Sequence, residues 1–173
     1  MNYPQLNISA ILEALLECTS ETEVVEFKEA KTSYEFTKLG KYFSALSNEA
    51  NLKHQSSSWL VLGVNDQRQV VGSNYRSQRS DLDRLKKGIA DKTTSGITFI
   101  DIHEVPHEKG RVILFEIPAA PKGLPIAFEG HYYGRDGESL SPLNLEEIER
   151  IRAQATLEDW SAALAACRTN KAA

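Results

Sequence analysis

Two runs of alternating side chains constrain the fold more than any other feature of this chain. ITFIDIHEV (97–105) and RVILFEI (111–117) alternate apolar and polar residues, and the short polar segment PHEKG joins them. Alternation with a period of two is typical of a strand with one buried face, and a short connection between two such runs predicts an antiparallel hairpin. The chain must therefore build a sheet around this hairpin.

Further runs extend this sheet. WLVLGVND (59–66) is continuously apolar between polar flanks, which indicates a central strand buried on both faces, and QVVG (69–72) follows a tight turn as its antiparallel partner. Residues 24–30 alternate less regularly and predict another strand. Two short strands, IAF and HYYGR, are expected after the loop AAPKGLP.

Helical spacing of apolar residues accounts for most of the remaining chain. Stripes that recur every three or four residues predict helices at about 7–18, 35–48, 81–92 and 144–166. The polar segment ANLKHQSSS (50–58) is expected to be a loop. We therefore predict an α+β fold, a mixed and largely antiparallel sheet flanked by helices. The 173 residues are expected to form a single domain, 1–173, with residues 144–173 as a C-terminal helix.

Composition restricts the setting and excludes several classes of enzyme. The formal net charge is −4, and no apolar run approaches the roughly 18 residues that span a membrane. Cys18 and Cys167 lack metal-type spacing, and the N-terminus lacks a secretory signal, so we expect a reducing, cytoplasmic location without a membrane partner. The histidines show no HExxH spacing and no phosphate-binding GxxxxGK[ST] loop occurs, which disfavours zinc hydrolases and NTPases.

Charge is unevenly distributed along the chain. Between Arg68 and Lys92, seven basic residues stand against three acids, whereas between Glu138 and Asp159 six acids stand against two arginines. The basic region could face a polyanion, or both regions could be ordinary solvated helix faces. The count alone leaves both interpretations open.

The run ETEVVEFK (21–28) carries the candidate chemistry. Residues i and i+2 of a strand project from the same face, so Glu26 and Lys28 should stand side by side while Phe27 points into the core. They could form an exposed ion pair that contributes little to the stability of the fold. Alternatively, Glu21 and Asp66 could join Glu26 around a hard divalent cation such as Mg²⁺ or Mn²⁺, with Lys28 assisting an attacking water.

Several motifs carry a resemblance to a known family. ETEVVEFK resembles the E-S-x-x-x-E-F-K signature of Schlafen-like domains, also described as AlbA-type DNA-binding domains. SALSN (44–48) is similar to the family's S-A-x-A-N helix end, WLVLGVNDQRQVVG (59–72) to its central strand pair, and HYYGRDGESLSPLNLEEIERI (131–151) to its closing segment. Two departures stand out. The family's Gly-Gly turn is replaced by a glycine-free loop after Asn48, and Asn65, expected to form a turn, replaces the first acid of an Asp pair.

The resemblance implies a function. Members that cut RNA hold a divalent metal with two glutamates and an aspartate, which correspond here to Glu21, Glu26 and Asp66, and Lys28 is the companion lysine. It implies a metal-dependent endoribonuclease that cleaves structured RNA, with transfer RNA the expected substrate, in a defence or toxin role. A non-catalytic nucleic-acid-binding regulator, with DNA as a further ligand, is the alternative. Because eukaryotic relatives clamp RNA between two domain copies, a homodimer is also expected.

Basic and aromatic residues complete the predicted site. We expect the nucleic-acid backbone to be gripped by Arg76, Arg79, Lys86 and Lys87. Arg135 matches the family's arginine before a glycine turn, and could pair with a carboxylate in the fold or with a phosphate. Tyr132, Tyr133 and Trp59 could stack on bases, although aromatic residues in short strands are more often part of the core.

Overall fold

The computed structural model describes residues 7–18 and 24–155. The main sheet has the strand order β1-β2-β4-β3, formed by β1 (Val25–Lys28), β2 (Ser57–Leu62), β3 (Asp101–Val105) and β4 (Val112–Pro118). Strands β1 and β2 are parallel, while β4 is antiparallel to both β2 and β3. A smaller antiparallel sheet contains β5 (Ala127–Phe128), β6 (His131–Asp136) and β7 (Ser139–Pro142). The predicted α+β fold with a mixed, largely antiparallel sheet is confirmed.

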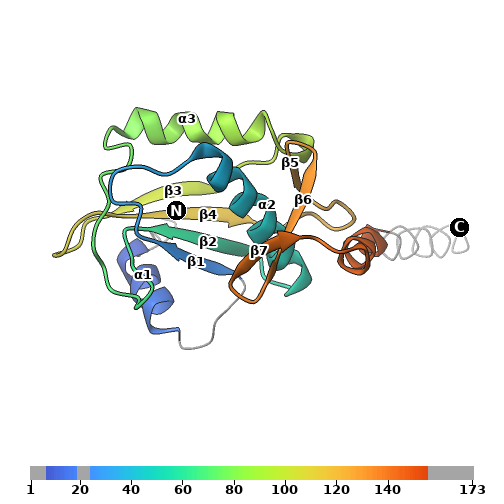
Figure 1. Ribbon diagram of the computed structural model, residues 1–173, viewed down its shortest axis with the longest axis horizontal. Helices are drawn as coiled ribbons and strands as arrows, with labels where there is room; N and C mark the ends of the chain where they lie inside the picture. The colour runs from blue at the N-terminus through green and yellow to red at the C-terminus, as the bar shows by residue number, and fades with distance from the viewer. Residues whose placement is uncertain (1–6, 19–23, 156–173) are drawn as a thin grey trace, which may run out of the picture.

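Helices cover both faces of the main sheet (Figure 1). Helices α2 (Phe36–Leu52) and α3 (Arg79–Ala90) pack on one face, and α1 (Ile8–Glu17) packs on the other. A single turn of 3-10 helix, η1 (Thr94–Gly96), follows α3, and a helix over 145–155 follows the small sheet. The central strand separates the two cores as predicted, because Leu60 and Leu62 join the α2 and α3 side while Val61 joins the α1 side.

One predicted helix boundary was wrong, and one strand was not predicted. Helix α2 continues to Leu52, through the first residues of the expected loop, because Asn51 and Leu52 are buried and Asn51 donates from Nδ2 to the Ala120 carbonyl at 2.7 Å. Strand β7 was not expected, since Ser139–Pro142 has no apolar alternation. It forms by pairing with β6, which places Leu140 opposite Arg135.

The motif SALSN attaches the small sheet to α2. Ser44 Oγ donates to the Ile126 carbonyl at 2.7 Å and accepts from the Tyr133 amide at 3.1 Å. One turn later, Asn48 is fully buried and bonds the Ile126 amide and carbonyl and the Tyr133 carbonyl, at 2.8 to 2.9 Å. Residues spaced by four lie on one face of a helix, so the motif fixes where β6 crosses α2.

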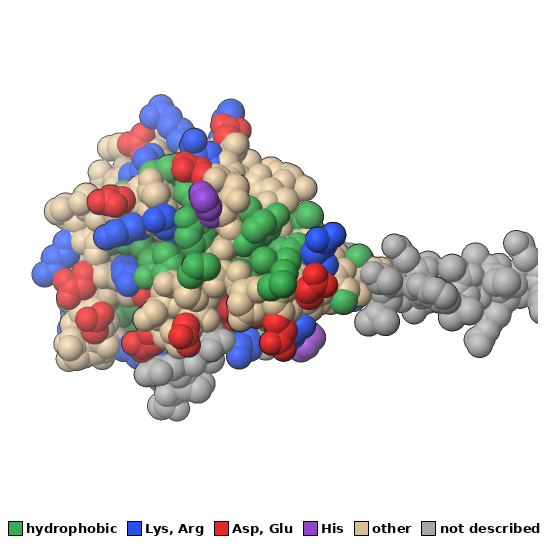
Figure 2. All heavy atoms as spheres, turned by 45° about the vertical axis from the view of Figure 1, so that its right-hand side comes forward, with side chains coloured by type: hydrophobic (Ala, Val, Ile, Leu, Met, Phe, Trp, Pro, Cys, Tyr) green, Lys and Arg blue, Asp and Glu red, His purple; other side chains and the backbone are tan. Residues whose placement is uncertain are grey.

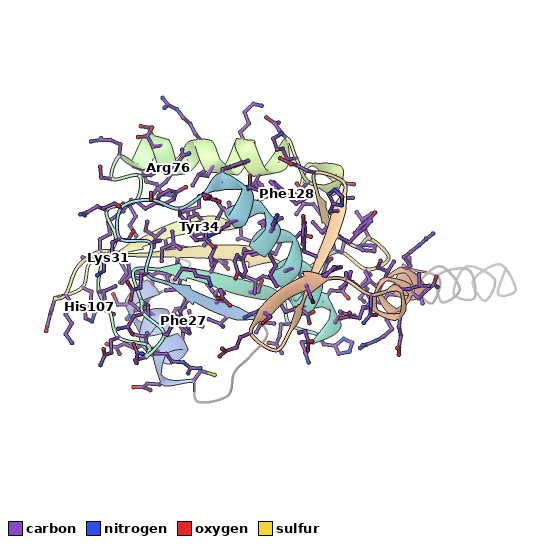
Figure 3. The ribbon with its side chains drawn as sticks, viewed as in Figure 1. Phe27, Lys31, Tyr34, Arg76, His107 and Phe128 are labelled. Carbon is purple, nitrogen blue, oxygen red and sulfur yellow. The ribbon has the colours of Figure 1, made fainter. Side chains whose placement is uncertain are left out.

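Gly40 allows the close approach of β5 to α2. A Cβ atom at this position would lie 2.1 Å from the Phe128 ring, which Figure 3 shows beside the helix. Replacing glycine with alanine in a helix normally stabilises it by about 1 kcal/mol. Here we expect Gly40→Ala to destabilise the protein by about 1–3 kcal/mol, because a packed ring must move. Urea unfolding tests this, with Gly88→Ala in α3, where the nearest ring atom is 3.2 Å away, as the milder comparison. A stabilising Gly40→Ala would contradict the packing described.

Candidate functional site

Glu26 and Lys28 project from the same side of β1, as the strand periodicity predicted. In the parallel register Glu26 lies beside Leu60 and Lys28 beside Leu62, so both side chains are on the α2 face of the sheet. Phe27 packs against the opposite core, with α1. The predicted orientation is confirmed, but Glu26 is not exposed, since only 8% of its surface is accessible.

The Glu26 carboxylate contacts two cations. One oxygen, Oε1, is 2.8 Å from Nζ of Lys28, and the other accepts a hydrogen bond from Nη2 of Arg135. Arg135 also donates from Nη1 to the Val25 carbonyl at 3.0 Å and from Nη2 to the Glu138 carbonyl at 3.3 Å. Its side chain is only 2% exposed. Of the two roles considered for Arg135, the structure therefore shows the ion pair within the fold, and in this arrangement a phosphate could not reach the guanidinium.

This arrangement leaves one positive charge at the surface. Glu26 carries one negative charge between two cations, and Arg135, the deeply buried one, neutralises it. Lys28 is 35% exposed, and its ammonium lies 5.1 Å from the centre of the Tyr42 ring. Burial lowers the pKa of Lys28, but hydrogen bonds and charge interactions with Glu26 and Tyr42 outweigh burial and raise it. Lys28 is therefore fully charged at neutral pH.

The predicted metal ligands do not form a cluster among the described residues. Asp66 is exposed in the turn after β2, four residues beyond the end of the strand, and no hydrogen bond or ion pair joins it to Glu26. Between residues 7–18 and 24–155, no group of three His, Cys, Asp or Glu side chains could hold a metal ion. Glu21 lies outside the described residues, so the three-carboxylate site remains a prediction.

Asn65, in contrast, is the turn former that the sequence predicted. Its Oδ1 accepts hydrogen bonds from the amides of Gln67 at 3.0 Å and Gln69 at 2.9 Å. These bonds close the turn between Val64 and Val70, which pair in an isolated antiparallel bridge. The strand expected at residues 69–72 is reduced to this single bridge.

The basic residues of α3 are largely neutralised by acids. Arg79 contacts Asp83, Asp101 and Glu104 at 3.1 to 3.6 Å. Lys86 is 3.0 Å from Asp101, and Lys87 is 2.6 Å from Asp91. Although burial raises the pKa of Asp101, its bonds to Lys86 and the Ile102 amide, with the charges of Lys86 and His103, lower it overall.

The Arg76 side chain likewise contacts other groups of the protein. Its Nη1 donates to the Asp81 carbonyl at 2.9 Å, and its guanidinium lies 5.7 Å from the centre of the Tyr75 ring. The excess of basic residues between Arg68 and Lys92 is therefore partly compensated by Asp101 and Glu104 of β3, which are distant in sequence. Figure 2 shows the result on one face of the molecule, where acidic and basic side chains are interspersed.

Sequence reasoning missed a second basic group, on α2. Lys41 lies 5.8 Å from the centre of the Tyr133 ring, and Lys38, one turn earlier, is exposed. Neither lysine forms an ion pair with a described residue. The signal was the spacing of Lys38, Lys41 and Tyr42, at i, i+3 and i+4, which puts them together on the polar side of the predicted helix. Tyr133 is half-buried and Tyr132 is 40% exposed, while Trp59 packs against the α1 core.

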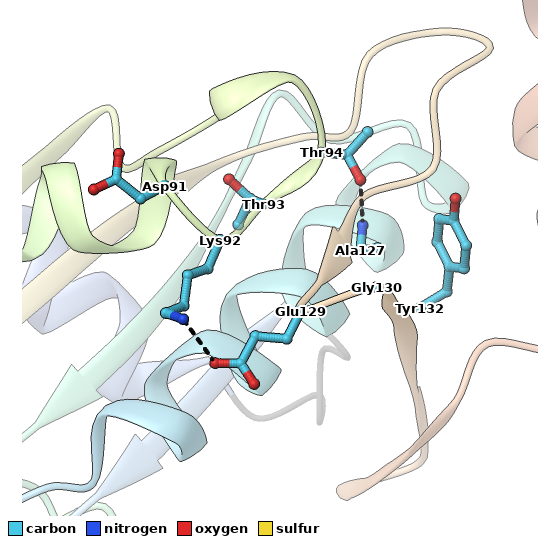
Figure 4. Close-up of a pocket in the computed structure, with 8 residues that line it drawn as sticks. All are labelled: Asp91, Lys92, Thr93, Thr94, Ala127, Glu129, Gly130 and Tyr132. Atoms are coloured by element: carbon cyan, nitrogen blue, oxygen red, sulfur yellow. Dashed lines mark hydrogen bonds and ion pairs between the residues drawn. The ribbon is translucent and has the colours of Figure 1, made fainter.

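The described residues also line a pocket of about 450 Å³ where α3 and η1 meet the β5–β6 turn (Figure 4). The ion pair of Lys92 with Glu129, at 3.5 Å, and the hydrogen bond from the Ala127 amide to Thr94 Oγ1, at 2.9 Å, hold its walls together. Of the candidate residues named from the sequence, Tyr132 lines it, whereas Glu26, Lys28, Asp66 and Arg135 do not.

The observed fold, a mixed and largely antiparallel sheet flanked by helices with Glu26 and Lys28 side by side on β1, agrees with the fold class and the strand motif expected from the sequence. The sequence model of the family described as "Schlafen, AlbA_2" matches residues 21–144. The chain therefore belongs to the Schlafen AlbA_2 family, and the predicted membership is confirmed.

A solved structure shares the fold. The DIP2311 protein from Corynebacterium diphtheriae is 20% identical, with a TM-score of 0.58 over 84% of this chain and 28% of that one. The chain thus spans little more than a quarter of that protein. The N-terminal domain of a Nitrosomonas europaea protein described as related to the ATP-dependent DNA helicase RecG is 19% identical, with a TM-score of 0.43 over 79% and 92% of the two chains. No curated protein matches. Among the described helices, none combines the length and apolarity needed to cross a bilayer.

Proposed function

We propose that this chain is a nucleic-acid-binding domain whose ligand is structured RNA, with transfer RNA as the expected substrate class. Membership of the Schlafen AlbA_2 family supports the proposal. The observation that carries it is the sharing of one buried carboxylate, Glu26, between Arg135 and Lys28. That sharing leaves the Lys28 ammonium as a charge that a phosphate can approach, beside the aromatic ring of Tyr42.

The second candidate is a metal-dependent endoribonuclease. The 2.8 Å contact between Lys28 and Glu26 favours it, because it supplies the neighbouring acid and base that the family's nucleases need. Glu26 as it stands does not fit a divalent cation, since both of its oxygens already contact positively charged groups. Mg²⁺ or Mn²⁺ binding would need Glu21 and Asp66 to supply most of the ligands, and we derive no catalytic step through a metal.

Binding and cleavage can be tested in one experiment. We expect the wild-type chain to bind transfer RNA in a fluorescence-anisotropy titration at low salt, with equal-length DNA duplex as the comparison. Failure to bind either nucleic acid would overturn the proposal, and preference for DNA would favour a DNA-binding regulator. Incubation with Mn²⁺ then tests the second candidate. Cleavage that disappears in Glu26→Gln would support the nuclease, whereas intact RNA or cleavage that survives the substitution would refute it.

A homodimer remains part of the proposal, because one copy supplies only half of the RNA clamp that the resemblance implies. Light scattering with and without transfer RNA would test it. A cytoplasmic, defence-related role remains a prediction.

A further inference from the structure

Five side chains from three elements form a continuous basic and aromatic surface, which we call the α2 lysine face. It contains Lys28 of β1, Lys38, Lys41 and Tyr42 of α2, and Tyr133 of β6. Lys28 lies 5.1 Å from the centre of the Tyr42 ring, and Lys41 lies 5.8 Å from the centre of the Tyr133 ring. Each ring therefore restrains a lysine while leaving its ammonium able to donate further hydrogen bonds.

The spacing within this face is fixed by buried contacts. Tyr133 is attached to α2 through its own backbone, because its amide donates to Ser44 and its carbonyl accepts from Asn48. Lys28 is held from the other side by Glu26, at 2.8 Å. The lysines are thus presented by α2 and β1, with Tyr133 of β6 anchored beside them.

The charge of this face differs from that of α3. Lys38 and Lys41 form no ion pair with a described residue, and Arg135 already neutralises the acid beside Lys28. Two exposed acids, Glu29 and Glu35, lie close in sequence, but Glu29 is 3.9 Å from the exposed Lys31, so the α2 lysine face and these neighbours retain a net charge of about +2. On α3, in contrast, Asp81, Asp83, Asp91 and Asp101 contact the basic side chains.

We propose that the phosphodiester backbone of nucleic acid docks on the α2 lysine face and not on α3. This inference rests on the proposed function, because it names where that binding occurs. Lys38 and Lys41, which form no ion pair with a described residue, can neutralise phosphates and so release the counterions condensed on the nucleic acid, whereas the basic residues of α3 would first have to give up ion pairs within the protein. Of the contacts that the sequence suggested, Arg79 and Lys86 then hold α3 against β3. Arg76 and Lys87 bond to groups of α3 and its C-cap, the Asp81 carbonyl and Asp91.

Matched charge reversals test the inference. The variant Lys38→Glu/Lys41→Glu should bind transfer RNA at least about tenfold more weakly than wild type, with a salt slope shallower by about 1.4 to 1.8, since two phosphate contacts are lost. The control is Arg84→Glu/Lys87→Glu on α3, where the two side chains are 74% and 81% exposed. It changes the net charge equally and should reduce affinity by less than about threefold.

The outcomes separate the two levels of proposal. If wild type binds no nucleic acid, the proposed function fails. If wild type binds but the α3 variant weakens binding as much as the α2 variant, or more, only the location is wrong. Circular dichroism checks that both variants are folded. Should the glutamates disrupt α2, Lys38→Gln/Lys41→Gln provides the same comparison against Arg84→Gln/Lys87→Gln.

Discussion

Replacing Arg135 with methionine is expected to lower the free energy of unfolding by about 3–5 kcal/mol. Methionine roughly keeps the buried volume but removes the cation that neutralises Glu26. It also leaves the carbonyls of Val25 and Glu138 without the hydrogen bonds that the guanidinium donates. Urea unfolding at neutral pH measures the loss, because a small single domain is expected to unfold in a two-state transition.

A double-mutant cycle separates the ion pair from packing. Glu26→Gln in the Arg135→Met background removes the buried carboxylate that only Lys28 would still neutralise, so the double variant should be more stable than Arg135→Met alone. A loss below about 1 kcal/mol for Arg135→Met, or no recovery in the double variant, would mean that the buried pair does not hold β6 against β1.

Replacing Asn48 with alanine should cost at least about 3 kcal/mol. The side chain is fully buried and makes hydrogen bonds to three backbone groups, namely the Ile126 amide, the Ile126 carbonyl and the Tyr133 carbonyl. Water cannot easily replace these bonds, and each unsatisfied buried group costs about 1–3 kcal/mol. Thermal and urea unfolding would both reveal the loss.

Asn65→Ala is the comparison for Asn48→Ala. It also removes two hydrogen bonds to backbone amides, but in an exposed turn where water can take their place, so a loss below about 1 kcal/mol is expected. Equal losses for the two asparagines would contradict the conclusion that Asn48 attaches the small sheet to α2.

The main sheet and the helices were largely predictable because the spacing of apolar residues along the chain indicates strands and helices directly. The hairpin of β3 and β4 followed from alternation, and the burial of β2 on both faces followed from its continuous apolar run. The exposure of Glu26 was misjudged because period-two reasoning gives the direction of a side chain but not what covers it. Arg135 of β6 covers this part of the edge of β1, where its guanidinium donates to the Val25 carbonyl.

Ion pairs between residues that are distant in sequence could not be predicted. Arg135 and Glu26 are 109 residues apart, so no local pattern links them. The neutralisation of α3 depends in the same way on Asp101 and Glu104, which come from β3. Family resemblance marked Asn48 within SALSN, but only the structure shows why asparagine is needed. Its amide donates to and accepts from Ile126, just before β5, and also donates to Tyr133 of β6.

These pairings change how the site is interpreted. A carboxylate that shares its charge with Arg135 and Lys28 favours a phosphate-binding surface more than a metal-binding one. The same network makes the surface dependent on the fold, because loss of Arg135 would leave Lys28 paired with Glu26 alone. We therefore expect folded Arg135 variants to bind RNA more weakly.

The most direct test of this account is the affinity of the wild-type chain for transfer RNA at about 50 and 200 mM salt. Three phosphate contacts, from Lys28, Lys38 and Lys41, predict a fall in affinity of about 20- to 40-fold between the two conditions. No binding at the lower salt concentration, or an affinity that does not change with salt, would contradict a nucleic-acid interface built on these lysines.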